Sequence, residues 1–550
     1  MAARCPPLSA FCFPKAALCR SITGVKPKFV PKPAPKPEPG LSPAQRRYFY
    51  FTAATTGAAI MIVEILGAKL LAPYVGTSHF VWTAQITITL VALASGYYLG
   101  GRWVDRSPRL RSLYLALVGA AVYLCGAALL VERVAYACLG AKLALGSLLA
   151  AAVLFFVPLA LLATVGPFMV RVLTQSLAGV GSSMGRLTAV STLGSVVGTI
   201  LIGYVLIPLL PNSLTLILTA GVLIGVAAIY FLIWGKAGGP QAMVAGALLL
   251  AVGCGFASGS KGRFDGANVR EVYHANSNFG QVQVLQLQNR PVRLYLNDFL
   301  EQGGYDTEAK QGVEMFTYLL HGLAKVYTTN VSDVLCIGLG VGIVPMKFAR
   351  EGARVDVAEI NPAAVPLAQK FFDLDPTRLK ITVGDGRQFV NASPKAQYDA
   401  IILDAFLGEA SPSHLMTREA FTAMRGILRP NGVLVINCFG DFTAGRDFLV
   451  TSLQKTLAAA FPSVRIHSGE DAGNVFFVAS ATELNRWRTP TLDDVHPACR
   501  ARAETAFARV VGANPEHGIV LTDDYNPVDY HDAANREAVR RNLARNMRDL

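Results

Sequence analysis

The chain has 550 residues, of which 52% are apolar and only 16% are charged, and its mean hydropathy is +0.39. Soluble domains carry about 25% charged residues, so this composition excludes a protein that is soluble along its whole length. The formal net charge of +13 does not predict nucleic-acid binding, because much of the excess lies in the N-terminal tail, beside apolar segments and in the last segment, NREAVRRNLARNMRDL. Basic residues beside apolar segments usually set membrane topology or contact anionic lipids.

Nine cysteines occur without a CxxC pair, and none stands near a histidine at metal-ligand spacing. This pattern predicts neither a disulfide framework nor a metal site. We therefore expect the soluble part of the chain to work in a reducing compartment.

Residues 1–47 contain one acidic residue, Glu38, and run through the segment KPKFVPKPAPKPEPG. Alternating lysine and proline cannot pack a core and favours an extended polyproline-II conformation. We interpret residues 1–47 as a disordered, basic and proline-rich tail. Residues 1–25 are poor in acidic side chains and carry scattered Arg and Lys, so a targeting peptide stays open as an alternative.

Residues 48–258 hold a series of long apolar runs with few charges. A helix needs about 20 apolar residues to cross a bilayer, so the pattern predicts a multi-pass transmembrane bundle of about seven helices. The runs lie approximately at 49–72, 81–101, 111–131, 143–165, 186–208, 212–234 and 241–258. Glycines at four-residue spacing let helix backbones approach closely. Such pairs are Gly96 with Gly100, Gly194 with Gly198, and Gly221 with Gly225.

Residues 259–270 are rich in Gly, Ser and Lys and are expected to form a linker. The next segment, GQVQVLQLQNRPVRLYLND, alternates apolar and polar side chains, which predicts a small antiparallel β-domain over residues 271–328. Over residues 329–550 strands and helices alternate, the pattern of a Rossmann-like α/β domain with a C-terminal extension. The expected fold class is therefore an α-helical transmembrane bundle fused to an antiparallel β-domain and a Rossmann-like domain.

The run DVLCIGLGVG is a buried strand followed by Gly338, Gly340 and Gly342. Glycines at a strand-to-helix turn let backbone amides approach a ligand and let the helix pack on the sheet. The next strand, RVDVAEI, ends about twenty residues on in Glu359, where a carboxylate accepts hydrogen bonds from ribose hydroxyls.

Two further strands carry acids at their ends. ITVGDG places Asp385 beside Gly386, where an aspartate can accept from an adenine amino group, and YDAIILDAF ends in Asp404. Open α/β sheets bind ligands at the carboxyl edge, so four consecutive strands bring polar groups to one place. The constellation predicts an adenosine-type ligand, AdoMet or a relative.

From about residue 279 to residue 440 the order of these features resembles the spermidine synthases, a family of polyamine aminopropyltransferases with an AdoMet-methyltransferase-type fold. The shared segments are the hairpin LYLNDFLEQ, a helix with Glu314 and Met315, the glycine turn, EINPAAVPLAQKFF, VGDG and YDAIILDA. A methyltransferase shares the glycine turn and the nucleoside acids. It does not normally carry the hairpin in which Gln302 follows Asp298 by four residues, as in the family's LDGxxQ.

The resemblance implies transfer of an aminopropyl group from decarboxylated AdoMet, a co-substrate, to putrescine or spermidine, with release of methylthioadenosine and no prosthetic group. It implies that Gln302 contacts the donor, Glu359 its ribose and Asp385 its adenine. Asp404 would then be the catalytic carboxylate that accepts a proton from the attacking amine.

Three positions depart from the family's pattern. Val341 replaces an Asp in the glycine turn, Leu407 replaces a second Asp after the catalytic one, and Gly312 replaces a Tyr before the Glu-Met pair. These positions normally help to hold the donor's amine or the acceptor polyamine, so other acids must replace them or the substrate differs. The candidates for an acidic groove that binds a polycation are Glu409, Asp471, Asp523 and Asp524.

Two other functions stay open: an AdoMet-dependent methyltransferase, and a membrane transporter whose soluble half senses a nucleoside or a polyamine. Gln302 and Asp404 favour the aminopropyltransferase, whereas Val341 and Leu407 weigh against it. The resemblance and the small-residue helix faces favour a homodimer.

The loops after the second, fourth and sixth apolar runs carry most of the basic residues, whereas the alternate loops carry only Arg133 and Lys142. The positive-inside rule then places the N-terminus in the cytosol, and seven crossings would place the soluble half outside. Because an AdoMet-type donor is made in the cytosol, we expect the catalytic half to face the cytosol or an organelle's equivalent compartment. The stretch 241–258, marginal in length, is then expected to break this parity.

Overall fold

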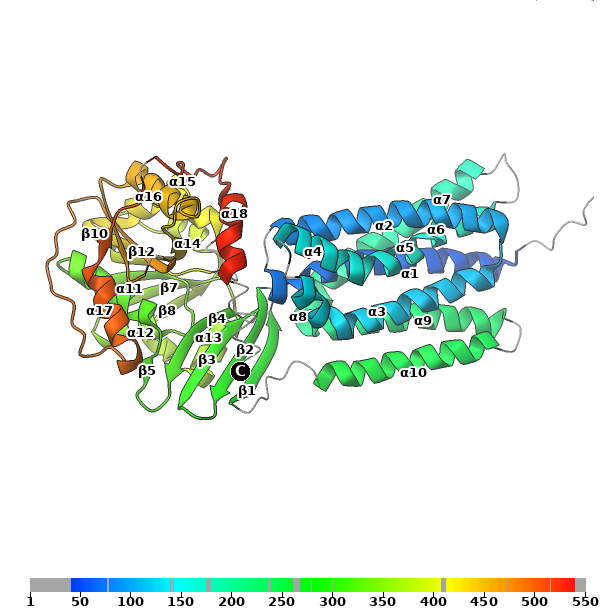
Figure 1. The fold of residues 1–550 in the computed structure, drawn as a ribbon, viewed down its shortest axis with the longest axis horizontal. Helices are drawn as coiled ribbons and strands as arrows, with labels where there is room; N and C mark the ends of the chain where they lie inside the picture. Colours follow the sequence, from blue (N-terminus) through cyan, green and yellow to red (C-terminus); the bar gives the residue numbers. More distant parts are fainter. Residues whose placement is uncertain are drawn as a thin grey trace, which may run out of the picture.

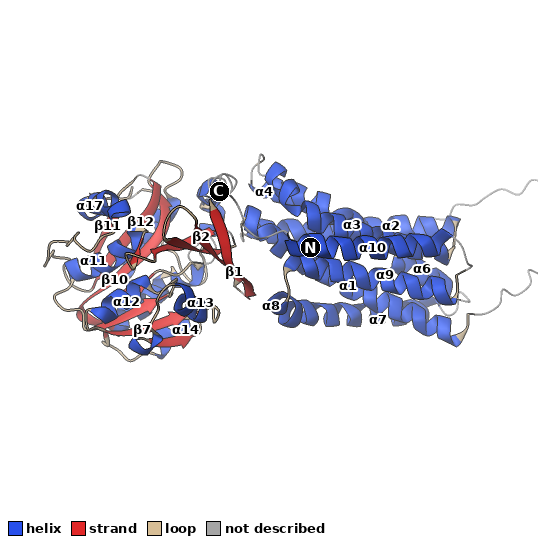
Figure 2. Ribbon diagram, turned by 90° about the horizontal axis from the view of Figure 1, so that it is seen from below, coloured by secondary structure: helices blue, strands red, loops and turns tan. Residues whose placement is uncertain are grey.

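The structure is a computed structural model that places a helical bundle and an α/β half end to end (Figures 1 and 2). It describes residues 41–76, 79–138, 141, 143–174, 180–235, 239–260, 268–277, 279–298, 300–406, 412–470, 472–514 and 516–539. Residues 1–40 of the predicted tail, together with Glu409 and Asp471, therefore lie outside the described residues.

The bundle contains seven helices that are long and apolar enough to cross a membrane, judged by length and composition among the described residues. Five are uninterrupted: α1 (Pro43–Val75), α2 (His79–Arg106), α3 (Leu110–Cys138), α9 (Asn212–Ile233) and α10 (Gly239–Ser260). The fourth in chain order consists of α4 (Leu143–Ala151), α5 (Val157–Ala163) and α6 (Val165–Leu173), and the fifth consists of α7 (Val180–Leu201) and α8 (Ile207–Leu209). The number agrees with the sequence-based expectation.

Two π-helical turns, Ala152–Phe156 and Ile202–Leu206, widen the fourth and fifth helices. Each turn ends two residues before a proline, Pro158 or Pro208. Proline lacks an N–H group and its ring clashes with the carbonyl group four residues earlier, and a widened turn relieves both problems.

Glycines bring two pairs of helices into close contact. A Cβ atom added at Gly194 would lie 2.0 Å from a carbonyl oxygen of α1, and one added at Gly96 would lie 2.2 Å from a carbonyl oxygen of α5. The predicted close approach is confirmed at these positions. It is wrong at Gly221 and Gly225, where an added Cβ would meet no described atom within 4 Å.

The stretch 241–258 lies within α10, which packs along α9 and α3 with no turn inside it. The structure therefore gives no support to a reversal of the chain in this stretch. Seven apolar helices of the described part separate the N-terminal tail from the α/β half. The start of α1 and the α/β half accordingly lie at opposite ends of the bundle (Figure 1).

The α/β half begins with the antiparallel sheet that the alternating pattern predicts, with strands in the order β1-β2-β3-β4-β5. Their bounds are β1 (Val269–Ser277), β2 (Gly280–Leu287), β3 (Val292–Asn297), β4 (Leu300–Asp306) and β5 (Gln311–Gly312). Two buried clusters, one centred on Val282 and Tyr295 and one on Val269 and Leu285, form its apolar core.

The second sheet has eight strands in the order β13-β11-β12-β10-β9-β6-β7-β8. Strands β10, β9, β6, β7 and β8 are parallel, and β11, β12 and β13 extend the sheet in antiparallel fashion. The bounds are β6 (Asp333–Ile337), β7 (Arg354–Glu359), β8 (Lys380–Val383), β9 (Tyr398–Leu403), β10 (Leu428–Asp441), β11 (Ser463–Ser468), β12 (Ala472–Ser480) and β13 (Val510–Val511). The chain runs outward from β6 in one direction and from β9 in the other, so the topological switch point lies between these two strands.

Helices cover both faces of this sheet. They are α11 (Met315–Tyr327), α12 (Ile343–Arg350), α13 (Ala364–Phe371), α14 (Gly386–Ala392), α15 (Arg418–Ile427), α16 (Phe448–Ala460), α17 (Arg500–Ala508) and α18 (Val528–His531). Alternate side chains of β6 enter two cores: Val334 packs with residues of α11, α12 and α17, and Leu335 packs with residues of α15 and α16. Burial on both faces explains why the parallel strands are continuously apolar in the sequence.

Contacts between the described residues of the two halves include packing of α8 against β1. Asn276 at the end of β1 donates from Nδ2 to the carbonyl oxygen of Leu210 at 2.8 Å, and the rings of Phe80 and Tyr530 lie 6.4 Å apart. The apolar core of the bundle contains only bundle residues, and the cores of the α/β half contain none of them.

We predict that a fragment beginning near residue 264 folds, stays soluble and keeps some activity without the bundle, because its cores are complete without bundle residues. Size-exclusion chromatography and thermal unfolding followed by circular dichroism would measure this. An aggregated or non-cooperative fragment, beside a full-length chain that unfolds cooperatively in detergent, would show that the bundle is needed for the fold.

Candidate active site

The glycine turn between β6 and α12 lies at the switch point of the sheet. Gly338, Gly340 and Gly342 have φ angles of 98°, 54° and 86°, which side chains rarely tolerate. A Cβ atom at Gly338 would lie 2.2 Å from the carbonyl oxygen of Asp404. At Gly340 an added Cβ would meet no described atom within 4 Å, so the middle of the turn faces open space that a ligand can approach.

Glu359 ends β7 beside this turn and is buried. Its Oε2 accepts a hydrogen bond from the N–H of Leu339 at 2.8 Å, and its Oε1 accepts one from the N–H of Asn361 at 2.7 Å. Burial raises the pKa of Glu359, and these backbone N–H groups oppose that shift. Each oxygen keeps a further lone pair, so a ribose bound over the turn can still donate to the carboxylate.

Asp385 follows β8 and caps α14, accepting from the N–H of Gln388 at 2.9 Å, and lies 2.9 Å from Nε2 of His414. Burial works against ionisation, but the Gln388 N–H and the His414 ring outweigh it and hold the pKa of Asp385 below its usual range. The carboxylate is therefore an ionised acceptor at neutral pH, as an adenine amino group requires. Gly386 lets α14 pack on β6, because an added Cβ would lie 2.5 Å from Ile337.

Asp404 follows β9 and is half-buried at the switch point. Its Oδ1 accepts from Nδ2 of Asn437 at 2.9 Å, and Oδ1 of Asn437 in turn accepts from Nδ2 of Asn474 at 2.9 Å. Burial raises the pKa of Asp404 to about 6, against the opposing effect of the Asn437 hydrogen bond. This carboxylate holds a proton better than an ordinary aspartate yet is mostly ionised near pH 7, which suits a general base.

Asn437 is a polar residue that the sequence-based reasoning missed. It lies in the apolar strand segment VLVINCF, and a buried amide among aliphatic side chains needs a hydrogen-bond partner. That single polar position in a buried strand is the signal that could have identified it.

Gln302, in β4, is a residue that the antiparallel sheet contributes to the site. Together with Gly338, Gly340 and Asp404 it lines one cavity. Tyr295 pairs with Gly303 and Leu296 pairs with Glu301, so the register shift leaves Gln302 as the extra residue of a β-bulge. Bulges re-aim side chains, which explains how a residue of β4 points to the glycine turn of another sheet.

Two of the three positions that depart from the family pattern are buried, and the third, Leu407, lies outside the described residues. Val341 is buried in the core cluster with Tyr295 and Phe372. Gly312 is buried, and a Cβ added there would lie 3.0 Å from Ile343. A side chain at this position would displace the end of Ile343, and Gly312 also lines a cavity of about 300 Å³.

The predicted acidic groove is described only in part. Asp523 is exposed and forms an ion pair with Arg387 at 2.8 Å, and its Oδ1 accepts from Oγ1 of Thr417 at 2.6 Å. These contacts, Arg387 foremost, lower the pKa of Asp523 and neutralise much of its charge. Asp524 is exposed beside it. An acceptor role for Asp523 and Asp524 stays a prediction, and so does that of Glu409 and Asp471.

Comparison with known proteins places this geometry in context. Residues 314–467 match the family described as the spermine/spermidine synthase domain. A polyamine aminopropyltransferase of Vibrio vulnificus is 40% identical over 130 residues, which are 22% of this chain and 44% of that protein. Spermidine synthase 1 of Pisum sativum is 29% identical over 251 residues, which are 41% of this chain and 67% of that protein. Putrescine N-methyltransferase 1 of Nicotiana tabacum is 33% identical over 112 residues, which are 19% of this chain and 30% of that protein.

Among solved structures, a probable spermidine synthase from Corynebacterium glutamicum is 18% identical, covers 42% of this chain and 86% of that chain, and has a TM-score of 0.36. The chain spans less than half the length of the Vibrio relative. The matched family segment contains the glycine turn, Glu359, Asp385 and Asp404, and the helical bundle lies outside it. By this match and these relatives, residues 314–467 are similar to the spermine/spermidine synthase domain, and the α/β half of the chain is similar to spermidine synthases.

Proposed function

We propose that the chain is a polyamine aminopropyltransferase that uses decarboxylated AdoMet as donor and releases methylthioadenosine. The observation that carries the proposal is the cavity at the switch point, which Gln302 of the antiparallel sheet and Asp404 of the parallel sheet line together. A nucleoside-binding edge alone is shared with methyltransferases. The same cavity also holds the carboxylate of Asp404, which can take a proton from an attacking amine, and the hairpin side chain of Gln302, which can contact the donor.

In this proposal the donor lies across the carboxyl edge of the sheet. Glu359 accepts from its ribose hydroxyls, Asp385 accepts from its adenine amino group, and Gln302 contacts the aminopropyl arm. The open turn at Gly338, Gly340 and Gly342 lets the donor approach the backbone.

The reaction forms one N–C bond and breaks one C–S bond. The lone pair of the acceptor nitrogen attacks the propyl carbon bound to the sulfonium, and the electrons of the C–S bond pass to sulfur, which leaves as the neutral thioether of methylthioadenosine. The nitrogen must lose a proton to react, and Asp404, with its pKa raised by burial to about 6, accepts it. Because the sulfonium is a good leaving group, positioning and charge complementarity supply most of the remaining catalysis.

A second candidate is an AdoMet-dependent amine methyltransferase, favoured by the similarity to putrescine N-methyltransferase 1. The two functions differ in the donor that they use: decarboxylated AdoMet for aminopropyl transfer and AdoMet for methyl transfer. Purified full-length protein in detergent should be incubated with putrescine or spermidine and with each donor in turn, and the products identified by mass spectrometry. Transfer from decarboxylated AdoMet, with no methylated amine from AdoMet, is the expected result, and the reverse would establish the methyltransferase.

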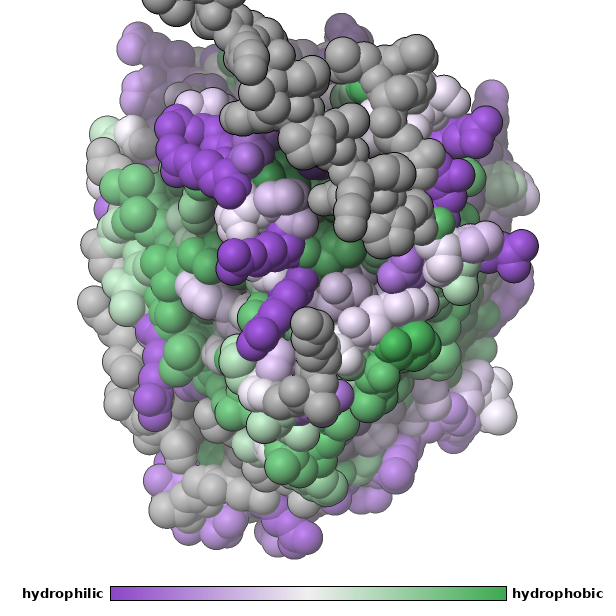
Figure 3. Space-filling model, turned by 90° about the vertical axis from the view of Figure 1, so that its right-hand side faces the viewer, coloured by the Kyte–Doolittle hydropathy of each residue, from purple (hydrophilic) through white to green (hydrophobic). Residues whose placement is uncertain are grey.

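We further propose that the seven apolar helices lie in a lipid bilayer. Their outer faces carry large exposed apolar side chains, among them Leu193 of α7 and Leu249 of α10, which are 64% and 73% exposed. Lipid contact removes such side chains from water. Figure 3 looks onto the bundle end that is remote from the α/β half, where purple hydrophilic side chains lie among green apolar ones. A homodimer stays a prediction.

We propose that the α/β half faces the cytosol, where the donor and polyamines are made. This choice rests on the aminopropyltransferase proposal. Arg102, Arg106, Arg109 and Arg111 lie at the end of α2 and the start of α3, at the bundle end remote from the α/β half. A cytosolic α/β half therefore places these arginines outside, against the positive-inside bias. That bias is statistical, whereas a transferase without its donor has no activity.

We predict that Asp404→Asn abolishes turnover and leaves donor affinity within a few-fold, because the amide cannot accept the proton.

The wild-type rate should fall as the pH drops through about 6, where Asp404 becomes protonated. Asn437→Ala removes the hydrogen bond that favours the charged carboxylate, so it should move this acid limb to higher pH. Rate profiles from pH 5 to 9 would show both effects, and an unchanged limb in Asn437→Ala would argue against Asp404 as the titrating group.

We predict that Glu359→Ala weakens the binding of methylthioadenosine and of AdoMet-type donors alike. Hydrogen bonds to a charged acceptor contribute roughly 1.5–3 kcal/mol each, so the loss should be about tenfold or more. Isothermal titration calorimetry would measure it, with Glu351→Ala, a half-exposed glutamate paired with Lys325, as the control. Since the change also leaves two backbone N–H groups without an acceptor, the melting temperature should be recorded for each variant. Unchanged affinity in a folded variant would place the ribose elsewhere.

We predict that a cysteine introduced at Asn268, in a cysteine-free background, resists a membrane-impermeant maleimide in intact cells and reacts once the membrane is opened. A cysteine at Ser107, between α2 and α3, should show the opposite behaviour and is the matched control. Prompt labelling at position 268 in sealed cells would place the α/β half outside and would require an exported donor or another reaction.

A further inference from the structure

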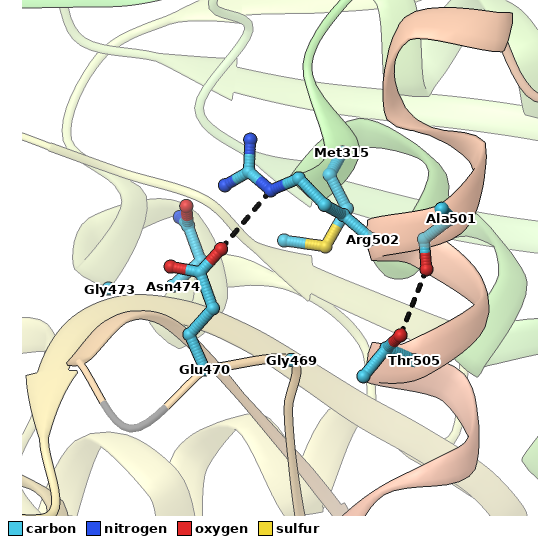
Figure 4. Close-up of a pocket in the computed structure, with 8 residues that line it drawn as sticks. All are labelled: Met315, Gly469, Glu470, Gly473, Asn474, Ala501, Arg502 and Thr505. Atoms are coloured by element: carbon cyan, nitrogen blue, oxygen red, sulfur yellow. Dashed lines mark hydrogen bonds and ion pairs between the residues drawn. The ribbon is translucent and has the colours of Figure 1, made fainter.

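A second cavity of the α/β half lies between the β11–β12 turn and α17 and has a volume of about 220 Å³. Its lining residues are Met315, Gly469, Glu470, Gly473, Asn474, Ala501, Arg502 and Thr505. Glu470 and Arg502 point toward one another across it, with Oε1 and Nε 3.2 Å apart (Figure 4). The sequence-based reasoning singled out neither of these two residues.

This cavity adjoins the catalytic carboxylate. Asn474, which lines it, donates to Asn437, and Asn437 donates to Asp404. Two hydrogen bonds and one amide group therefore separate the cavity wall from the group that accepts the proton. Met315 lines the second cavity, and the next two residues, Phe316 and Thr317, line the cavity at the switch point. Neighbouring residues of the described chain therefore line the two cavities, and none of those residues lines both.

The charges in the cavity do not suit the far end of a simple diamine. An ammonium group beside Glu470 would also face the guanidinium of Arg502, which repels it. The Glu470 and Arg502 side chains are 58% and 59% exposed, so water screens their mutual ion pair, and the charges of a ligand can replace it. A ligand head that carries both an ammonium and a carboxylate satisfies both side chains, the carboxylate by a bidentate contact with arginine.

The remaining walls fit such a ligand. Gly469 and Gly473 present no side chain, and Gly473 has a φ of 134°, which favours glycine. The flexible thioether of Met315 can pack on methylene groups. The pattern that normally holds a plain polyamine is also altered, since Gly312 lacks the tyrosine ring.

We propose that the second cavity binds the head of the acceptor and that the acceptor is a diamino acid. Its ammonium and carboxylate lie between Glu470 and Arg502, and its terminal amine reaches Asp404. This inference rests on the proposed aminopropyl transfer and specifies its acceptor. The terminal nitrogen forms the N–C bond, the C–S electrons pass to sulfur, and the proton goes to Asp404, so the products are an N-aminopropyl diamino acid and methylthioadenosine.

The test compares acceptors with the full-length protein in detergent and decarboxylated AdoMet. Release of methylthioadenosine is measured with lysine, ornithine, putrescine and spermidine. We expect kcat/KM for lysine or ornithine to exceed that for putrescine by at least about tenfold, as one charge-assisted contact allows. Arg502→Gln should remove this preference through KM and leave kcat within a few-fold, and Arg502→Lys should restore part of it.

The matched control is Arg500→Gln. Arg500 lies on the same helix but donates to the carbonyl oxygens of Asp493 and Val495 and does not line the cavity. This variant should keep the wild-type preference. An equal loss in both variants would indicate a general effect on α17 and would overturn the assignment of Arg502.

The outcomes separate the two proposals. If putrescine or spermidine is the better acceptor and Arg502→Gln leaves the ratio unchanged, the diamino-acid inference is wrong and aminopropyl transfer stands. If no amine releases methylthioadenosine, the proposed function fails. Calorimetric binding of lysine and of putrescine to protein saturated with methylthioadenosine then still tests the cavity: tighter binding of lysine that Arg502→Gln abolishes supports the inference, and equal binding overturns it.

Discussion

The absence of a side chain at Gly338 is the constraint on which the site depends. The carbonyl oxygen of Asp404 lies where a Cβ atom of residue 338 would be, and the N–H of Asp404 donates to the carbonyl oxygen of Ile337 at 3.0 Å. The ends of β6 and β9 can therefore lie side by side at the switch point. One backbone contact thus fixes the glycine turn and the Asp404 carboxylate relative to one another.

Two side-chain amides, those of Asn437 and Asn474, hold Asp404 in place through hydrogen bonds. Asn437 is buried in β10, and an unpaired amide there would destabilise the fold. Its two polar atoms are satisfied by Asp404 on one side and Asn474 of β12 on the other. The antiparallel extension of the sheet is consequently joined to the reacting centre. The hydrogen bonds that satisfy Asn437 in the core also orient the carboxylate of Asp404.

Much of this arrangement could be predicted from local sequence. The glycine turn, Glu359, Asp385 and Asp404 each follow an apolar strand, and parallel strands bring their carboxyl ends to one edge regardless of other details. The apolar helices are likewise visible from length and composition. Three-dimensional context was needed where partners are distant in the chain: the Asn437–Asn474 pair, the Glu470–Arg502 pair, and the contact between Asp523 and Arg387. The four-residue spacing of Gly221 and Gly225 predicted a close helix–helix contact that the structure does not show. Spacing alone does not tell which face of a helix has a neighbour.

The two halves meet close to the carboxyl edge of the parallel sheet, where Glu359 lies. Asn276, which donates to Leu210 of the bundle, is followed by Ser277, whose hydroxyl oxygen accepts from Nδ2 of Asn361 at 3.3 Å. The N–H of Asn361 in turn donates to Glu359. A continuous series of neighbours and hydrogen bonds therefore runs from the α8–α9 connection to the carboxylate of Glu359. Separate apolar cores stabilise each half, so contacts at the boundary, this polar connection and the Phe80–Tyr530 ring contact among them, orient Glu359 relative to the bundle.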